Sequence, residues 1–148
     1  MAHALTYRKE VKTMTEKLEK EYYIKFINPF YRTARIEIEQ LDSLKTPEEK
    51  EQCRRSWTLD ECKKIVQMDL EMIDESDGIL AFLTKGILGT ACEFQYARTI
   101  NKKIFVITET YMQHPWVRSY SDLIVASIDD FKKWLDSNGY RRSHEKKS

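Results

Sequence analysis

The sequence predicts an α/β fold, a doubly wound and mostly parallel five-stranded sheet flanked by helices, with a short first strand. Two observations indicate it. Residues 79–83 and 103–108 are short apolar runs with the continuous pattern of strands that are buried on both faces. Helical patterns lie between such runs, and strands that alternate with helices form parallel βαβ units.

The first half of the chain carries the weaker signals. Apolar residues recur at spacings of three and four over residues 6–21, which predicts a surface helix. The aromatic and β-branched run of residues 22–27, stopped by Asn28 and Pro29, predicts a strand. Residues 46–49 (TPEE) have the pattern of a helix start with Pro at its first position.

The second half has stronger signals. Thr58 and Glu61 form a capping-box pattern that predicts a helix reaching about residue 75. The later elements are expected, in order, as a strand at 79–83, a helix at 90–100, a strand at 103–108, a strand at 123–126 and a helix at 128–135. Such an order is typical of a Rossmann or flavodoxin-like sheet. We expect one domain over residues 1–137, followed by a basic tail over 138–148 that frays.

Composition excludes several classes of protein. Twenty-five Lys and Arg against 24 Asp and Glu give a net charge of +1, so no general field attracts nucleic acid or a membrane surface. No apolar run approaches the roughly 20 residues of a membrane span, and the N-terminus is charged where a signal peptide is apolar. We therefore expect a cytoplasmic protein. Cys53, Cys62 and Cys92 lack close pairing, which favours free thiols, and neither a metal nor a cofactor is expected.

The binding site is expected where ligands of open α/β sheets lie, outside the carboxyl ends of the strands. Aromatic residues near that edge can stack on a flat ligand ring, although an aromatic residue in such a place more often packs in the core. The substrate-binding candidates are His3, Tyr7, Arg8, Pro29, Phe30, Tyr31, Trp57, Gly89, Thr90 and Trp116.

Asp69 is the first of two carboxylates in unexpected positions. It falls within the predicted core-facing stripe of its helix, four residues after Ile65 and four before Ile73. An ionised carboxylate is costly to desolvate without a partner, so Asp69 either forms an ion pair or lines a cleft. The alternative is an Asp at the margin of the stripe that reaches solvent. Asp77 has a simpler interpretation, as part of the turn before the strand.

Glu93 is the second carboxylate in an unexpected position. Thr90 and Glu93 match a capping box, so Glu93 can simply tie off the start of its own helix. Its position after a buried strand and a Gly-containing loop favours another role, at the mouth of the carboxyl-edge cleft. There a carboxylate can act as nucleophile toward a sugar carbon, because it stabilises the oxocarbenium-like transition state of glycosidic cleavage. A second carboxylate can protonate the departing base.

With these residues in view, the stretch from Asp69 to Ile107 resembles the nucleoside 2-deoxyribosyltransferase family, which includes the related nucleoside 5′-monophosphate N-glycosidases. The similarity is carried by the segments DLEMIDESDGILAFL, GTACEFQYA and NKKIFVIT, and it covers about a quarter of the chain closely. Asp69, Ile73 and Asp77 match the family's Asp, Ile and Asp. Glu93 matches its Glu, which a Tyr-Ala pair follows at 96–97.

The resemblance implies a function. Glu93 would form a covalent glycosyl-enzyme intermediate, Asp69 would orient the substrate and assist protonation, and Gly89 and Thr90 would lie beside the sugar 5′ position. The substrate would be a nucleoside or its monophosphate, and the sugar would pass to another base or to water. Such enzymes are homo-oligomers, so we expect a dimer or a larger assembly, with exposed aromatic residues of the 109–120 segment as a candidate contact.

Two departures from the family pattern keep an alternative open. Residues 1–4 retain only the carboxyl end of the family's first strand, and the loop at 84–88 lacks an Asp that the transferases often carry. These departures favour a non-catalytic module that binds a nucleotide-derived small molecule in the same cleft. A third possibility is an NAD glycohydrolase of the TIR type, which also uses a Glu in a small α/β domain.

Overall fold

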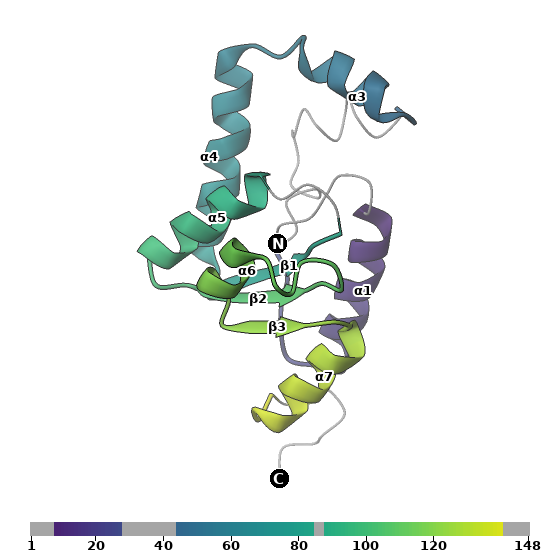
Figure 1. The fold of residues 1–148 in the computed structure, drawn as a ribbon, viewed down its shortest axis with the longest axis vertical. Helices are drawn as coiled ribbons and strands as arrows, with labels where there is room; N and C mark the ends of the chain where they lie inside the picture. Colours follow the sequence, from purple (N-terminus) through teal and green to yellow (C-terminus); the bar gives the residue numbers. More distant parts are fainter. Residues whose placement is uncertain (1–7, 28–43, 85–87, 141–148) are drawn as a thin grey trace.

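The computed structural model describes residues 8–27, 44–84 and 88–140, and its elements carry the labels of Figure 1. Within these residues it has six helices and three strands. In chain order they are α1 (Arg8–Glu21), α3 (Pro47–Arg54), α4 (Leu59–Glu75), β1 (Gly78–Phe82), α5 (Leu88–Thr99), β2 (Lys103–Ile107), α6 (Pro115–Tyr120), β3 (Leu123–Val125) and α7 (Ile128–Ser137). The predicted α/β class is confirmed.

The three strands form one parallel sheet in the order β1-β2-β3. Gly78 pairs with Lys103 at one end of β1, and Phe82 pairs with Ile107 at the other. Parallel neighbours need a crossover, and α5 connects β1 to β2 while α6 connects β2 to β3. The arrangement is compatible with a Rossmann-like fold, but the described residues contain three strands and not the predicted five.

Helices cover both faces of the sheet, because successive side chains of each strand point to opposite sides. On one face α4, α5 and α6 bury Ile73, Ile79, Ala81, Leu83, Phe94, Ala97, Ile104, Val106 and Val117. On the other face α1 and α7 bury Val11, Leu18, Tyr22, Leu80, Phe82, Ile107, Phe131 and Leu135. The three layers can be followed in Figure 1. The apolar runs of β1 and β2 therefore serve two cores, as their composition predicts.

Local capping signals place two helix starts as predicted. The Thr46 side chain accepts a hydrogen bond from the Glu49 backbone N–H, at 3.1 Å, and the Glu49 carboxylate accepts one from the Thr46 N–H, also at 3.1 Å. The backbone N–H groups of Thr46 and Lys45 both donate to the Glu49 carboxylate and lower its pKa. Thr58 and Glu61 make the same reciprocal pair at the start of α4. Each capping box satisfies donors that the first turn of a helix leaves unpaired.

The predicted strand at residues 22–27 is wrong, since none of residues 23–27 belongs to a strand. The backbone N–H of Phe26 donates instead to the Glu19 carboxylate, at 2.6 Å. Ile24 and Phe26 pack against the core between α1, α7 and the sheet. Ile24 and Phe26 thus cover a core, and neither pairs with a strand of the described residues. The short first strand predicted at residues 1–4 lies outside the described residues.

The sheet covers only part of α4, so the predicted core-facing stripe of this helix is only partly buried. Ile73 is buried, but Cys62 and Val66 are exposed. A 17-residue helix is about 25 Å long, whereas a five-residue strand spans about 16 Å, so the first half of α4 extends past β1. Figure 1 shows this half, with α3 beyond it, standing away from the strands. No helix among the described residues has both the length and the apolar character needed to cross a membrane.

Candidate functional site

The carboxyl ends of β1 and β2 are joined by a side chain that the sequence analysis did not single out. Thr108, directly after β2, is buried, and its hydroxyl donates to the Leu83 carbonyl at 2.8 Å. The same oxygen accepts the backbone N–H of Tyr111 at 3.1 Å. Thr108 therefore holds the segment after β1 against the loop after β2. A Thr that ends an otherwise apolar strand was the available signal.

Glu93 lies on α5, the helix that follows β1. It is half-buried and is the sixth residue of the helix, since α5 begins at Leu88. The predicted start at Thr90 is wrong, because Thr90 is the third residue of α5 and its side chain is buried. Thr90 therefore does not cap the helix, and the capping-box interpretation of Glu93 is wrong. Glu93 stands about 8 Å along the helix axis from its first residue, in the second turn.

Asp69 lies on α4 and is also half-buried. It comes one turn before Met72 and Ile73, the two buried residues of that helix. Asp69 and Glu93 each have an interaction partner in the structure, so neither is an isolated charge. The two helices share one core, in which Ile73 of α4 packs with Phe94 and Ala97 of α5. The two predicted catalytic carboxylates thus come from helices that pack together on one face of the sheet.

Tyr96 connects α5 to α4. Its hydroxyl donates to the Asp74 carboxylate at 2.7 Å, and this hydrogen bond is the main reason why the pKa of Tyr96 is raised. The Lys102 ammonium donates to the backbone carbonyl of Asp74 at 3.1 Å. Ala97, the next residue, is completely buried, so α5 lies close to its neighbours there. The Tyr-Ala pair that carried part of the family resemblance therefore fixes the packing of the two carboxylate-bearing helices.

The start of α5 presents two further candidates in different ways. Gly89 is exposed, and a side chain at this position would meet open space. The Thr90 side chain, on the same helix, is buried. Only Gly89 of the two is therefore exposed, and it lies in the first turn of a helix, where backbone N–H groups favour anions.

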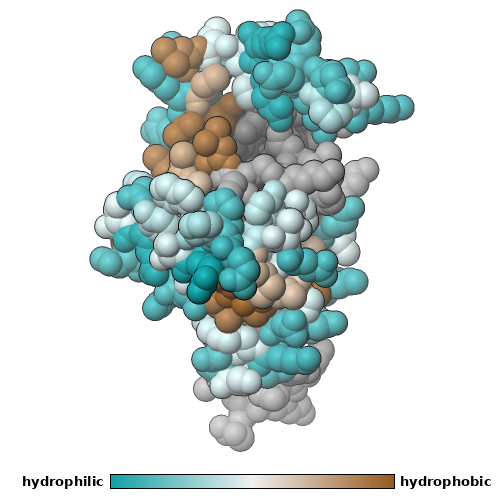
Figure 2. Space-filling view, in the orientation of Figure 1, coloured by the Kyte–Doolittle hydropathy of each residue, from teal (hydrophilic) through white to brown (hydrophobic). Residues whose placement is uncertain are grey.

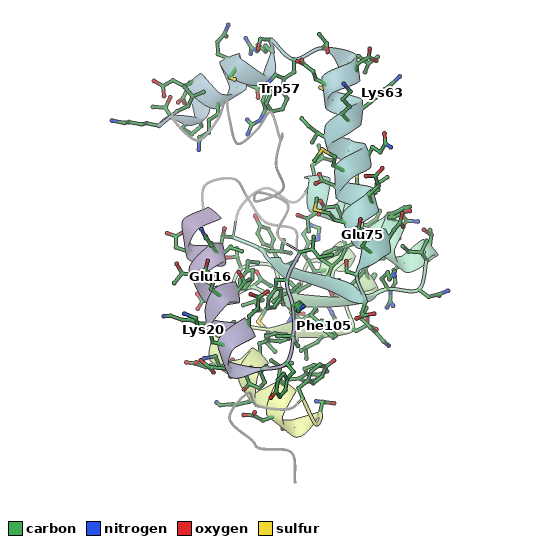
Figure 3. All side chains as sticks on the ribbon, turned by 180° about the vertical axis from the view of Figure 1, so that it is seen from behind. Glu16, Lys20, Trp57, Lys63, Glu75 and Phe105 are labelled. Atoms are coloured by element: carbon green, nitrogen blue, oxygen red, sulfur yellow. The ribbon has the colours of Figure 1, made fainter. Side chains whose placement is uncertain are left out.

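The two Trp candidates lie apart from each other. Trp57 is half-buried at the junction of α3 and α4, and Figure 3 shows it at the end of α4 remote from Glu75. Trp116 lies on α6, is 49% exposed, and stacks on Tyr120 with ring centroids 5.4 Å apart. Arg8 is the first residue of α1. The remaining substrate-binding candidates, His3, Tyr7, Pro29, Phe30 and Tyr31, lie outside the described residues.

His114 was not predicted as a site residue, although its loop had an unusual composition. It precedes Pro115, the first residue of α6, in the segment that follows β2. Its ring meets the Tyr111 ring edge-on, with centroids 6.1 Å apart. Its Nδ1 atom is buried and has no hydrogen-bond partner within the part of the chain that the structure describes. A buried ring nitrogen of this kind is a candidate contact for a ligand at the carboxyl edge.

No group of three or more His, Cys, Asp and Glu side chains suited to a metal ion occurs within residues 8–27, 44–84 and 88–140. Comparisons of the chain with protein-family models, curated proteins and solved structures give no match. The functional argument therefore depends on the geometry of the chain and on the residues themselves.

Proposed function

We propose that the protein cleaves the N-glycosidic bond of a nucleoside, a deoxynucleoside or their 5′-monophosphates, with Glu93 as the nucleophile. The observation that carries the proposal is that two half-buried carboxylates, Asp69 and Glu93, lie on two helices that share one core. Desolvating a carboxylate is costly, and such groups are concentrated in sites where they perform chemistry. Because Thr90 is the third residue of α5, Glu93 does not form the predicted capping box with it.

The chemistry follows from the residue types. A Glu93 carboxylate oxygen forms a bond to the anomeric carbon while the bond from that carbon to the base nitrogen breaks. The departing base takes a proton from Asp69 or from water. Water or a second base then attacks the anomeric carbon, which releases Glu93 as a carboxylate, and the attacking group gives up its proton to Asp69 or to water. The products are a free sugar or a new nucleoside, and the enzyme returns to its starting form.

The decisive assay measures base release by chromatography from deoxynucleosides, ribonucleosides, their 5′-monophosphates and NAD, each with and without an acceptor base. Wild type should release base from one of these classes. Glu93→Gln should lower kcat by a factor on the order of 10⁴ or more, as removal of a covalent nucleophile does. Asp69→Asn should lower it by about 10²–10⁴, the range for a proton donor.

A matched control is available on the opposite layer. Glu16 is exposed on α1, about two turns along the helix from Arg8 (Figure 3), so Glu16→Gln changes the same side chain in the same way away from the candidate residues, and its kcat should equal that of wild type. Folding of each variant is checked by circular dichroism. Folded wild type that releases no base from any substrate class would refute the proposal, and so would a Glu93→Gln variant with undiminished turnover.

One observation favours a second candidate function. Asp69 and Glu93 each already have a partner, as carboxylates in a structural network do. A non-catalytic binder of a nucleotide-derived small molecule would use the same cleft without turnover. It predicts that wild type and Glu93→Gln bind a nucleoside monophosphate with similar affinity in calorimetry, and that neither releases base.

A further inference from the structure

The first half of α4 exposes an apolar face in the described structure. Leu59 is 69% exposed and Val66 is 56% exposed, and Cys62 between them is also exposed. With half-buried Leu70 they form a stripe at spacings of three and four along one side of the helix. A shallow groove follows this stripe and is lined by Leu59, Cys62, Lys63, Val66, Gln67, Leu70, Glu71 and Asp74. Figure 2 shows hydrophobic residues gathered along this upper part of the molecule.

A further exposed apolar residue lies on α5. Leu88, the first residue of that helix, is 84% exposed, and α4 and α5 pack together. Contiguous exposed apolar residues with a polar margin mark interaction surfaces more often than scattered single ones do. Tyr23, on the far layer, is 69% exposed but is a single residue of that kind.

Charges along the margin of the groove identify the partner. Lys63 lies in the first half of α4, Glu71 lies in the second half, and Gln67 lies midway between them. The side-chain amide of Gln67 donates a hydrogen bond to the Glu71 carboxylate at 2.8 Å, so Gln67 is linked to the acidic half of the helix. Lys63 is labelled in Figure 3, on the part of α4 that stands away from the sheet. The cation, amide and anion are spaced four residues apart. If a second copy of the helix runs antiparallel, its anion therefore lies opposite the cation of the first copy.

We propose that α4 pairs antiparallel with α4 of a second copy of this chain, about a two-fold axis near Val66 and Gln67. This isologous pairing sets Lys63 of each copy against Glu71 of the other, brings the two Val66 side chains together and places Cys62 of each copy near Leu70 of the other. A membrane surface or a nucleic acid would favour basic margins, whereas this groove has both signs. The proposal is independent of the function proposed for Glu93.

The size of the contact sets its strength. A helix about 25 Å long with a contact strip about 10 Å wide contributes roughly 250 Å² per copy, against roughly 800 Å² in a standard interface. The contact must therefore include surface beyond α4 itself. We expect a dimer that dissociates on dilution, with a Kd on the order of micromolar.

Sedimentation velocity of the full chain over a range of concentrations tests the pairing. Wild type should pass from monomer to dimer, and Val66→Glu should remain monomeric at every concentration. Val66 is already more than half exposed, so this substitution leaves the fold intact. Tyr23→Glu is the matched control, since it changes an equally exposed residue outside α4 and should dimerise like wild type.

A charge exchange tests the register. Lys63→Glu and Glu71→Lys should each raise the Kd about tenfold, because each places like charges together twice in a two-fold contact. The double variant K63E/E71K should return the Kd to within about twofold of wild type. A double variant as weak as its parents would overturn the antiparallel register.

Disulfide trapping locates the axis. In a background in which Cys53, Cys62 and Cys92 are changed to Ser, Val66→Cys should form a covalent dimer under mild oxidation, because the two copies of residue 66 meet at the axis. Lys64→Cys, one helix face away, should not. A protein that stays monomeric at all concentrations would overturn the proposal. This is also the result expected if another part of the same chain covers the groove. A dimer unaffected by Val66→Glu would overturn it too, since the contact would then lie elsewhere.

Discussion

The same substitution at two glycines should change stability in opposite directions. At Gly78, the first residue of β1, an added Cβ would lie 2.7 Å from the Lys103 carbonyl oxygen and 3.2 Å from the Lys103 Cβ. The carbonyl belongs to the paired strand β2, where Lys103 is the register partner of Gly78. It cannot move aside without disturbing the ladder. Overpacking of this kind costs about 1–3 kcal/mol, so Gly78→Ala should destabilise by that amount.

Gly89, in contrast to Gly78, has open space around it. This residue lies in the first turn of α5, and an added Cβ would meet no atom within 4 Å. Alanine is more favourable than glycine in a helix by about 0.5–1 kcal/mol, chiefly because an unfolded chain with alanine has less conformational freedom to lose on folding. Gly89→Ala should therefore stabilise the protein, and the two variants should differ in free energy of unfolding by about 1.5–4 kcal/mol.

Urea unfolding followed by circular dichroism at 222 nm measures both variants against wild type. The midpoint should fall for Gly78→Ala and rise for Gly89→Ala while the m-value stays constant. Equal and neutral effects would refute the close approach of β1 to β2 at Gly78. A destabilised Gly89→Ala would refute the helical assignment at the start of α5. The second variant also tests the candidate site, because Gly89 is expected beside the sugar.

Three other outcomes follow from the described contacts. Tyr96 donates to Asp74, and its pKa is raised above 10.0, so the pair contributes stability below that pH and loses it as pH rises through the folded pKa. Thermal melts from pH 8 to pH 11 should therefore fall more for wild type than for Tyr96→Phe, and parallel curves would contradict this. Phe94 is 1% exposed in the core between α4, α5 and the sheet, so Phe94→Ala should cost about 3–5 kcal/mol in urea unfolding; a cost below about 1 kcal/mol would contradict that packing. Thr58→Ala removes the cap of α4 and should cost about 1 kcal/mol by the same method, whereas no change would show that the cap is dispensable.

Elements with local signals were predictable from the sequence. The strands β1 and β2 are apolar on both faces, and β1 extends one residue before its predicted start, to Gly78. The starts of α3 and α4 were marked by Thr46 and Thr58, whose side chains accept hydrogen bonds from the first turn. Such signals depend only on neighbouring residues, and for that reason they survive in the folded chain.

Features that depend on a distant partner were not predictable. Residues 22–27 have the composition of a strand, but a strand also needs a neighbour with free hydrogen-bonding groups. The sequence pattern of α4 shows which face of the helix is apolar, but it does not show how much of that face the sheet covers. Helix α6 was missed because its six residues, PWVRSY, are too few to show a periodicity.

The candidate site divides in the same way. Asp69 and Glu93 were found because a carboxylate among apolar residues is visible in the sequence. The packing of their helices was not visible, because it depends on contacts such as Tyr96 with Asp74, which are 22 residues apart. Thr108 and His114 were missed because a single Thr or His has no pattern of its own. Their positions follow only when the ends of β1 and β2 are placed side by side.

The most direct test of the central claim is to trap the covalent intermediate. Wild type is incubated with a 2′-fluoroarabino nucleoside that carries a good leaving base. The fluorine destabilises the oxocarbenium-like transition states of both steps, but the good leaving base keeps the first step fast enough for the adduct to accumulate, and the intact protein is weighed by mass spectrometry. Our account predicts one added fluorosugar per chain, located on Glu93 by peptide mapping, and no addition to Glu93→Gln. An adduct on another residue, or no adduct together with no base release from the natural substrates, would contradict it.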